Sequence, residues 1–209
     1  MGKRYDERNG KVGNKHKAEP IKNVKDIQKI KQYLLGKTSK RDYALFVVGI
    51  NIGLRASDLV KLKVGEVYNV ERGEIREKVR ILELKTGKER EFTVNSSAKN
   101  ALYLYFSERG SLDKDDWVFQ SQKHSSLHVK SVARMIREVG RELGLPYNLS
   151  SHSLRKTFGY QAYINNIQKD NGFIYTLQSI FNHSSAKTTL RYIDIDIEKI
   201  SNVYQELNL

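Results

Sequence analysis

The chain has 209 residues and a formal net charge of +13 at pH 7, from 37 lysines and arginines against 24 aspartates and glutamates. This length supports one substantial core, and the basic excess favours a polyanionic partner without distinguishing nucleic acid from an anionic membrane. The lack of cysteine excludes disulfides, thiolate metal sites and a cysteine nucleophile. Because there is neither a long apolar run nor a charged-then-apolar leader, we expect a soluble, cytoplasmic protein encoded by a bacterium or a phage.

The first twenty residues are basic and almost free of apolar side chains. They contain six lysines and arginines, interrupted by Asp6 and Glu7. This composition predicts a mobile basic arm over residues 1–20. A solvated tail and a phosphate-contacting arm are equally good readings of it. The globular part is expected to begin near Ile21.

The segment from Asp42 to Ile52 is too rich in apolar residues for a surface helix, and Gly53 then interrupts the pattern. We expect a buried helix that ends in a turn. Ser57 or Asp58 lies near the start of the next apolar pattern, where the backbone offers free amides and a locally positive end. Arg55 therefore lies where an anion can bind.

From residue 66 to 94 the apolar period shifts toward two, on either side of a lysine-rich turn that contains Lys85 and Lys88. This pattern predicts a β-hairpin. Helical spacing returns over residues 98–105 and 129–143 and predicts two amphipathic helices. The expected fold class is α+β, mostly helical with a small antiparallel sheet, because the strands cluster and do not alternate with helices.

Two polar residues in the last third, His152 and Arg155, are three positions apart and would share one helix face. Ser150 or Ser151 can cap the start of that helix. Imidazole, guanidinium and free amides together suit a phosphate. Such pairs are also common on solvated helices, so this motif alone is weak evidence.

Further along, His183 lies in a polar stretch between two predicted helices and is followed by Tyr192. A capping or core histidine is the alternative explanation of the first residue. Tyr192 is one of twelve tyrosines, and most tyrosines pack the ring and hydrogen-bond the hydroxyl without doing chemistry. Only the combination of motifs gives these residues weight.

Taken together, the motifs resemble the tyrosine recombinase (phage integrase) family. IFNHSSAKTTLRYID resembles the closing segment of the family, in which a His-Ser-Ser/Thr turn precedes the nucleophilic tyrosine by nine residues, as His183 precedes Tyr192. HSLRKTF resembles the family's His-x-x-Arg-His/Lys-Thr-Phe helix. NIGLRASDLVKL resembles the segment with the first arginine, and LELKTGKEREFTV resembles the hairpin whose lysine enters the site.

The resemblance covers roughly residues 24 to 193 and implies the catalytic-domain fold of these DNA breaking-rejoining enzymes. We expect that domain over residues 21–193. The resemblance points to Asp58 as a support for the first arginine. It implies that the catalytic residues are Arg55, Lys85, His152, Arg155, His183 and Tyr192.

These residue types explain DNA cleavage without a metal or another cofactor. The Tyr192 hydroxyl would attack the scissile phosphorus, forming a 3′-phosphotyrosyl bond and releasing a 5′-hydroxyl. Because tyrosine is mostly neutral at pH 7, a base must help, and His152 is preferred. The two arginines would clamp the charge of the transition state, with a hydrogen bond from His183. Lys85 would protonate the leaving oxygen.

The expected partner is double-stranded DNA, and the resemblance implies a tetramer on synapsed DNA, with an accessory DNA-bending protein as a further candidate. Alternative functions are relaxation of DNA by a type IB topoisomerase and DNA binding without catalysis. A departure from the family is Phe181-Asn182 in place of Leu-Gly. We also expect no separate N-terminal core-binding domain, so the chain would be a minimal recombinase, a fragment, or one half of a clamp that another protein completes. The side chains expected to contact DNA are those of Lys88, Arg90, Lys156 and Arg191.

The C-terminus, residues 194–209, is acidic, with four acidic residues against one lysine and hence a side-chain charge of −3. Ile197, Ile200, Tyr204 and Leu207 recur at helical spacing. We expect a helix that docks on a neighbouring protomer, as in many members of the family, or packs on its own domain.

Overall fold

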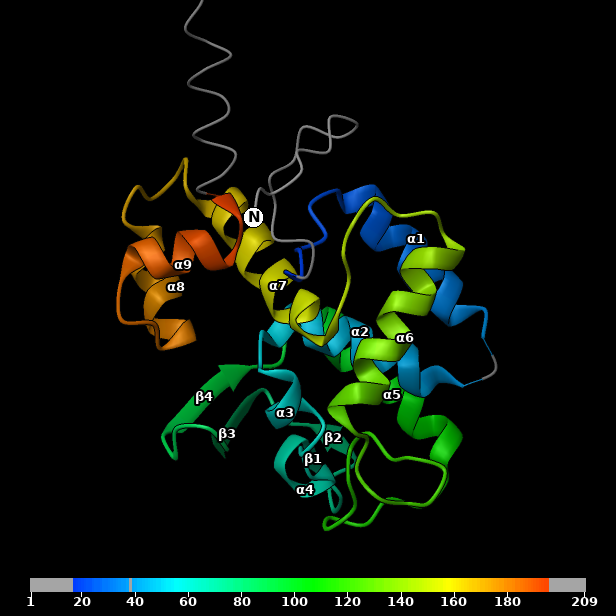
Figure 1. The fold of residues 1–209 in the computed structure, drawn as a ribbon. Helices are drawn as coiled ribbons and strands as arrows, with labels where there is room; N and C mark the ends of the chain where they lie inside the picture. The colour runs from blue at the N-terminus through cyan, green and yellow to red at the C-terminus, as the bar shows by residue number, and fades with distance from the viewer. Residues whose placement is uncertain (1–16, 38, 196–209) are drawn as a thin grey trace, which may run out of the picture.

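The computed structural model describes residues 17–37 and 39–195, which form helices and two small antiparallel sheets (Figure 1). Most of the expected arm, and of the expected terminal helix, lies outside these residues. Within them no helix is long and apolar enough to cross a membrane. The elements are α1 (Val24–Leu35), α2 (Lys40–Ile52), α3 (Ala56–Leu59), α4 (Val64–Val67), β1 (Tyr68–Asn69), β2 (Glu74–Ile75), β3 (Lys78–Leu82), β4 (Glu89–Thr93), α5 (Ser96–Arg109), α6 (Val129–Glu142), α7 (Ser151–Asn166), α8 (Phe173–Phe181) and α9 (Ala186–Tyr192).

Helix α2 is the buried helix that the apolar run predicted. It packs against α5 and α7, and its side chains from Ala44 to Val48 are all buried. The Ser39 side chain accepts a hydrogen bond from the Arg41 amide at its start, and Gly53 ends it in the left-handed conformation with φ of 61°. The polar N-cap and the glycine therefore define both ends of this helix.

Two hydrophobic clusters lie on either side of α7. The larger cluster contains α1, α2, α5, α6 and the inner face of the β3–β4 hairpin. The smaller one is built from α8 and the residues that follow α9. Leu154, near the start of α7, belongs to the larger cluster, and Tyr163, near its end, belongs to the smaller one. Helix α7 thus joins the two clusters.

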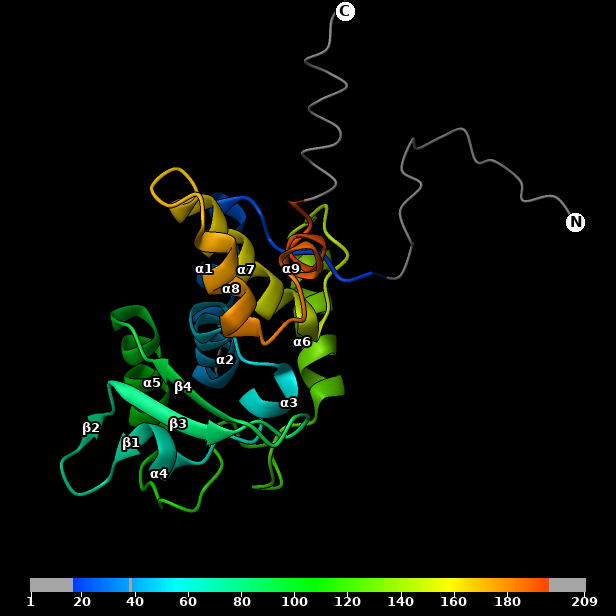
Figure 2. The ribbon, with the colours of Figure 1, turned by 90° about the vertical axis from the view of Figure 1, so that its left-hand side faces the viewer.

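Close approach of α8 and α9 to α7 depends on Gly159. A Cβ atom at this position would lie 2.6 Å from Phe181 Cζ and 2.7 Å from Ile193 Cγ2, too close for real atoms. In both ribbon views α8 and α9 lie together beside α7, with the β3–β4 hairpin below them (Figures 1 and 2). The missing side chain sets how tightly the last two helices pack.

The predicted hairpin is formed by β3 and β4, which pair antiparallel with Val79 opposite Phe92. Both of these side chains are buried, so the alternation expected for a half-buried strand is present. Leu84 lies in the turn and is 62% exposed. The short elements α4, β1 and β2 were not predicted, because two to four residues are too few to show a period.

Candidate active site

The turn after α2 organises the first arginines of the site. The Gly53 carbonyl accepts hydrogen bonds from Arg155 Nη1 at 2.6 Å and Arg90 Nη2 at 3.3 Å. A side chain at residue 53 would require an unfavourable φ, and its Cβ would lie 2.3 Å from Phe158 Cδ1. Glycine is therefore needed to place this carbonyl between two guanidinium groups. Arg55 follows directly, as the N-cap residue of α3.

Arg155 connects the two halves of the molecule. Its side chain comes from α7, is only 3% exposed, and also donates from Nη2 to the Phe181 carbonyl at 3.1 Å. The guanidinium lies over the Phe181 ring, 4.5 Å from its centroid. Burial, and then the charge of Arg90, lower the pKa of Arg155 to about 10, so it remains a cation at pH 7.

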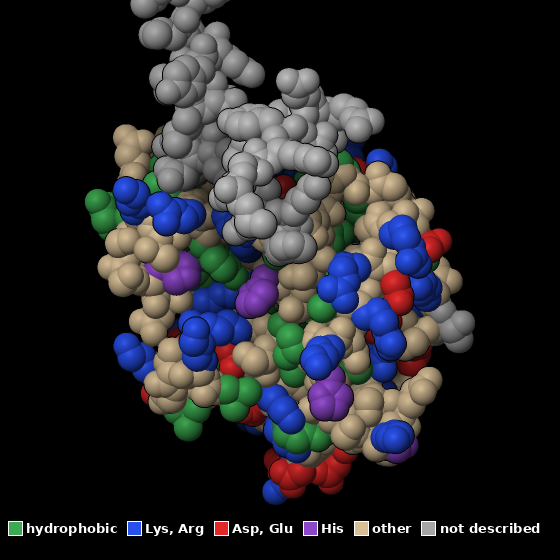
Figure 3. Space-filling model, in the orientation of Figure 1, with side chains coloured by type: hydrophobic (Ala, Val, Ile, Leu, Met, Phe, Trp, Pro, Cys, Tyr) green, Lys and Arg blue, Asp and Glu red, His purple; other side chains and the backbone are tan. Residues whose placement is uncertain are grey.

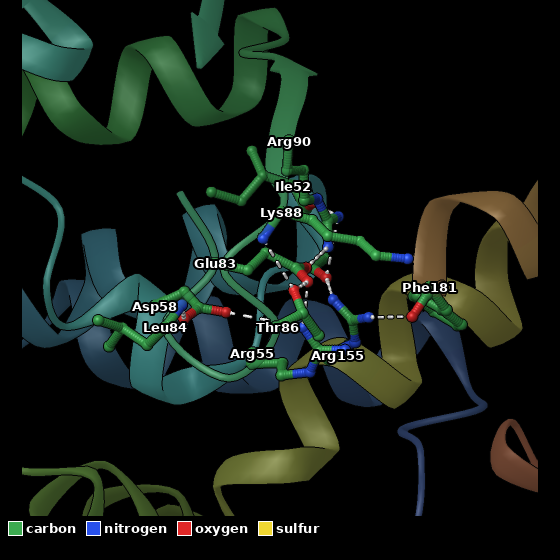
Figure 4. A network of polar contacts seen from close by, with 11 residues as sticks. Ile52, Arg55, Asp58, Glu83, Leu84, Thr86, Lys88, Arg90, Arg155 and Phe181 are labelled. Atoms are coloured by element: carbon green, nitrogen blue, oxygen red, sulfur yellow. Dashed lines mark hydrogen bonds and ion pairs between the residues drawn. The ribbon is translucent and has the colours of Figure 1, made fainter. Parts of the chain in front are cut away.

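Arg55 is paired with a carboxylate that was not among the predicted site residues (Figure 4). Its Nη1 lies 2.6 Å from Glu83 Oε2 in an ion pair, but 4.0 Å from Asp58 Oδ2. Asp58 instead accepts a hydrogen bond from the Leu84 amide through Oδ1 at 3.1 Å. The expected support from Asp58 is thus directed mainly at the hairpin, and Glu83 is the nearer partner of Arg55.

His152 lies in the first turn of α7, where the Ser150 hydroxyl accepts from its amide at 3.3 Å. Its ring is solvent-exposed, yet the surrounding protein still desolvates it in part. This desolvation, together with the charges of Lys156, Arg155 and Lys85, lowers the pKa of His152. The imidazole is therefore neutral at pH 7 and able to accept a proton. Lys85 is exposed on the hairpin turn, near enough for its charge to act on His152.

His183 and Tyr192 meet where α8 and α9 come together. Asn182 ends α8 in the left-handed conformation, which directs the chain back, and His183 Nδ1 then lies 3.1 Å from Thr189 Oγ1. The rings of His183 and Tyr192 pack edge to face with centroids 5.2 Å apart. Burial lowers the pKa of His183, as do the charges of Arg155 and Arg55.

Tyr192 is the last residue of α9 and is half-buried. Burial raises the pKa of its hydroxyl, and the nearby guanidinium groups of Arg155 and Arg55 oppose that rise. The phenol is therefore protonated at pH 7 and needs a base to become a nucleophile. The same guanidinium groups would stabilise negative charge on the phenol oxygen or on a phosphate beside it.

Two of the four predicted DNA-contacting residues are directed into the protein, which corrects that expectation. Lys156 is 3% exposed, and its Nζ lies 3.3 Å from Asp194 Oδ1. The Arg90 side chain is 10% exposed and lies 3.4 Å from Glu83 Oε1. Buried charges are kept by such partners. Asp194 is distant in sequence from Lys156, whereas Glu83 belongs to the same hairpin as Arg90. Lys88 and Arg191 are exposed, as DNA contacts require.

A charged network joins the start of the described chain to the end of α9. Asp194, 7% exposed and with a positive φ of 62°, accepts from Lys17 Nζ at 2.7 Å as well as from Lys156. Burial, only partly opposed by Asp194, lowers the pKa of Lys156 to about 8. Lys17, expected to belong to the mobile arm, is thus held against the fold two residues beyond Tyr192.

Glu83 was not predicted as a site residue, although the pattern of buried residues in the preceding strand indicates it. In β3 the inward-facing positions are Val79 and Ile81, and continuing the period of two places Glu83 on the same inner face. A carboxylate on a buried face needs a cationic partner. The alternation therefore marked a buried acid beside Lys85.

The face seen in Figure 1 carries many basic side chains, with histidines among them and acidic side chains gathered toward its lower edge (Figure 3). Among residues 17–37 and 39–195 no group of three or more histidine, aspartate and glutamate side chains could hold a metal ion. The chemistry available at the site is that of guanidinium, imidazole, ammonium and phenol groups. Together these groups can bind a phosphodiester, stabilise charge on it and attack it.

Comparison with known sequences agrees with this chemistry. The sequence profile of the Phage integrase family matches residues 21–199. The chain is 37% identical over 191 residues to the probable integrase/recombinase YoeC of Bacillus subtilis, covering 91% of this chain and 97% of that protein. It is 26% identical to tyrosine recombinase XerC of Pelobacter propionicus, covering 79% of this chain and 51% of XerC.

Solved structures share the fold. The XerA recombinase superposes with a TM-score of 0.66 at 22% identity, over 91% of this chain and 64% of XerA. The XerH site-specific recombinase bound to its palindromic difH substrate, in a post-cleavage complex, superposes with a TM-score of 0.64 at 18% identity. That match covers 88% of this chain and 52% of XerH. The chain thus spans nearly all of YoeC but only about half to two thirds of the Xer proteins.

Proposed function

The chain belongs to the phage integrase family of tyrosine-type site-specific recombinases, and from this we propose that it cleaves and rejoins DNA through a covalent 3′-phosphotyrosyl bond to Tyr192. The observation that carries the proposal is the position of the buried, cationic Arg155. It comes from α7, yet its charge acts on the hydroxyl of Tyr192, from α9, and on the ring of His183. The proposed nucleophile, Tyr192, therefore lies near Arg155 and His183, two groups that can stabilise charge on a phosphate.

In the proposed cleavage step, Tyr192 Oη attacks the phosphorus and the bond from phosphorus to the 5′-oxygen breaks. His152, neutral at pH 7, accepts the phenol proton. Arg55 and Arg155 bind the non-bridging oxygens as negative charge builds up, and His183 adds a hydrogen bond. Rejoining is the reverse reaction, in which a 5′-hydroxyl attacks the phosphotyrosyl bond, so no nucleotide cofactor is consumed.

Lys85 is proposed to give the departing 5′-oxygen its proton. The residue is exposed on the β3–β4 turn, and its charge reaches His152 across the site. A lysine on a hairpin tip can approach DNA after binding. Lys88 and Arg191, both exposed, are proposed to contact the DNA backbone.

Double-stranded DNA is the proposed partner, by analogy with XerH bound to difH. Strand exchange requires two duplexes, so we propose assembly of several protomers on DNA, with a tetramer as the synaptic form. Because the matches to the Xer proteins span part of their length, residues 21–193 are proposed as the catalytic half of a clamp. A second protein is one candidate for the other half.

The proposal is tested with nicked suicide substrates made from the DNA that flanks the gene. Cleavage next to a nick releases a short strand, which prevents rejoining and accumulates the covalent complex. We expect a denaturation-resistant protein–DNA adduct linked to a 3′ end. Binding of this DNA without any adduct would overturn the proposal and favour a non-catalytic DNA-binding protein.

A second assay separates recombination from topoisomerase activity. Plasmids carrying two copies of the flanking DNA should give recombinant products with the wild-type protein. Relaxation of supercoils without exchange of strands would instead favour the type IB topoisomerase reaction. Lys85→Ala should lose most of the activity in either assay, since both reactions need protonation of the leaving oxygen.

A further inference from the structure

We propose that Glu83 is a positioning residue of this reaction, which holds Arg55 in the phosphate site and fixes the turn that carries Lys85. The inference rests on the proposed function and assigns a role to a residue for which neither the sequence motifs nor the comparisons give one. Glu83 directly follows β3, and its side chain is 4% exposed. A carboxylate so deeply buried is retained only when strong partners satisfy it.

The partners of Glu83 come from the hairpin itself and from Arg55 at the start of α3 (Figure 4). One carboxylate oxygen, Oε2, lies 2.6 Å from Arg55 Nη1 and accepts from the Thr86 hydroxyl at 2.8 Å. The other, Oε1, accepts from Arg90 Nη1 at 3.4 Å. The carboxylate therefore bridges two guanidinium groups and the hairpin turn.

This bridge reduces the electrostatic repulsion among three neighbouring arginines. Arg55, Arg90 and Arg155 lie close enough for their charges to oppose one another, and all three are largely buried. Asp58 is the more distant anion, with its Oδ2 4.0 Å from Arg55 Nη1. Glu83 is the anion in direct contact with two of the three arginines. Without it, repulsion would push the Arg55 guanidinium away from the others.

Glu83 also closes the hairpin turn. Its amide donates to the Lys88 carbonyl at 2.9 Å, and its carbonyl accepts from the Gly87 amide at 2.8 Å. With the Thr86 hydroxyl bond, three of its polar groups fix the segment 84–87, which contains Lys85. The position of Arg55 and the conformation of the turn beneath Lys85 are thus coupled through one side chain.

Arg55 remains available for a phosphate in this arrangement, because its side chain is still 20% exposed. The ion pair orients the guanidinium before DNA binds. Preorganised donors of this kind stabilise a transition state at little cost of rearrangement. We therefore expect Glu83 to affect the rate of cleavage more than the affinity for DNA.

The test is single-turnover cleavage of a suicide substrate by Glu83→Gln, which keeps the shape and removes the charge. We expect a loss of about 10²-fold in the cleavage rate, of the size seen when one transition-state donor is lost, with DNA binding changed less than about threefold. The matched control is Glu91→Gln on β4, which removes an exposed carboxylate paired with Arg80. That variant should cleave like the wild type.

A substrate with sulfur in place of the bridging 5′-oxygen separates the two effects of Glu83. A thiolate leaves without needing a proton, so this substrate should fully restore cleavage by Lys85→Ala but not by Arg55→Ala. It should restore Glu83→Gln only in part, because the Arg55 defect remains. Full restoration would mean that Glu83 affects cleavage only through the turn that carries Lys85. No restoration would mean that it acts only through Arg55. Either result overturns the proposed coupling.

Folding is checked by thermal unfolding of each variant. If Glu83→Gln fails to fold, the test uses Glu83→Asp, which keeps the charge on a shorter side chain. We expect Glu83→Asp to cleave at a rate between those of the wild type and Lys85→Ala. Wild-type cleavage on normal DNA separates the two proposals. If the wild type forms the adduct and Glu83→Gln forms it equally fast, only the role of Glu83 is overturned.

Discussion

The two sides of the candidate site are built on very different amounts of protein core. The Gly53 turn, Arg55 and the β3–β4 hairpin lie against the larger cluster, which extends over most of the described fold. His183 lies in the turn between α8 and α9, and Tyr192 is the last residue of α9. Among the described residues, these helices are held by a cluster of six buried side chains. Since buried apolar contacts determine how readily a segment opens, the proposed nucleophile is carried by the part that moves at lower cost.

Two residues of α7, Arg155 and Gly159, lie at the junction of these sides. Arg155 donates to the Gly53 carbonyl on one side and to the Phe181 carbonyl on the other. Gly159 sets the spacing between α7 and the last helices. Substitutions at the junction should therefore uncouple the phosphate site from the tyrosine, and they provide the strongest tests of the comparison.

Arg155→Ala should have the largest effect, because it removes both the proposed clamp and the junction. We expect cleavage to fall about 10³-fold. Stability should fall by about 3 kcal/mol, since the Phe181 carbonyl loses this donor and the Gly53 carbonyl keeps only the longer bond from Arg90. Arg155→Lys keeps the charge but cannot bridge both carbonyls, so it should recover part of the stability and little of the cleavage. Denaturant unfolding and single-turnover cleavage measure the two effects, and wild-type cleavage by Arg155→Lys would contradict the bridging role.

Gly159→Ala tests the small cluster without touching a proposed catalytic group. The added methyl would meet Phe181 and Ile193, so α8 and α9 must shift. We expect a loss of about 1–3 kcal/mol in stability and a loss of about tenfold or more in cleavage, because Tyr192 moves relative to Arg155. The control is Gly36→Ala after α1, where the nearest atoms would lie 3.6 Å from the new Cβ. Equal effects of the two variants would argue against a separate, easily displaced tyrosine side.

Asp194→Asn should have a smaller effect on cleavage. It leaves Lys156 buried without its anion, while asparagine tolerates the positive φ of 62° at this position. We expect a stability loss of about 2–3 kcal/mol and a several-fold loss of cleavage, since the network lies two residues beyond Tyr192. The double variant Asp194→Asn with Lys156→Met should be more stable than Asp194→Asn alone. Additive losses in the double variant, measured by unfolding, would show that the pair does not couple.

The pH dependence is the mildest expected effect. The pKa of His152 is lowered by desolvation and neighbouring cations, so the folded protein binds this proton less readily than the unfolded chain. The neutral form required for base catalysis is therefore present at pH 7. Both stability and cleavage should decline only as the pH falls below about 6.5. A cleavage profile with its acid limb above pH 7 would contradict this assignment, and His152→Gln should flatten the limb.

Local patterns in the sequence predicted much of this arrangement. The buried helix, its glycine stop, the hairpin and the Ser150 cap follow from apolar period and capping residues. Arg155 and His183 are marked by motif spacing. The contact of Lys156 was not predictable in this way, because its partner Asp194 is brought to it only by tertiary packing. Arg90 and Glu83 meet within the predicted hairpin, so their contact lies within reach of the local pattern.

The size of the hydrophobic cluster that supports each side of the site could likewise not be predicted from the sequence. Helices α8 and α9 have ordinary apolar spacing, and nothing in that spacing shows that they form a cluster of their own. The separation arises because Leu154 and Tyr163 of α7 pack in opposite directions. Only the folded arrangement shows that the proposed nucleophile and the proposed clamp belong to different packing units.

The most direct test of this view is to map the amino acid that is joined to DNA. Wild-type protein trapped on a nicked suicide substrate is digested with nuclease and protease, and the nucleotide-bearing peptide is identified by mass spectrometry. We expect the modification on Tyr192, among the twelve tyrosines of the chain, and its complete loss in Tyr192→Phe without a change in DNA binding. An adduct on another residue, or one that persists in Tyr192→Phe, would contradict the assignment of the nucleophile to the α8–α9 side of the site.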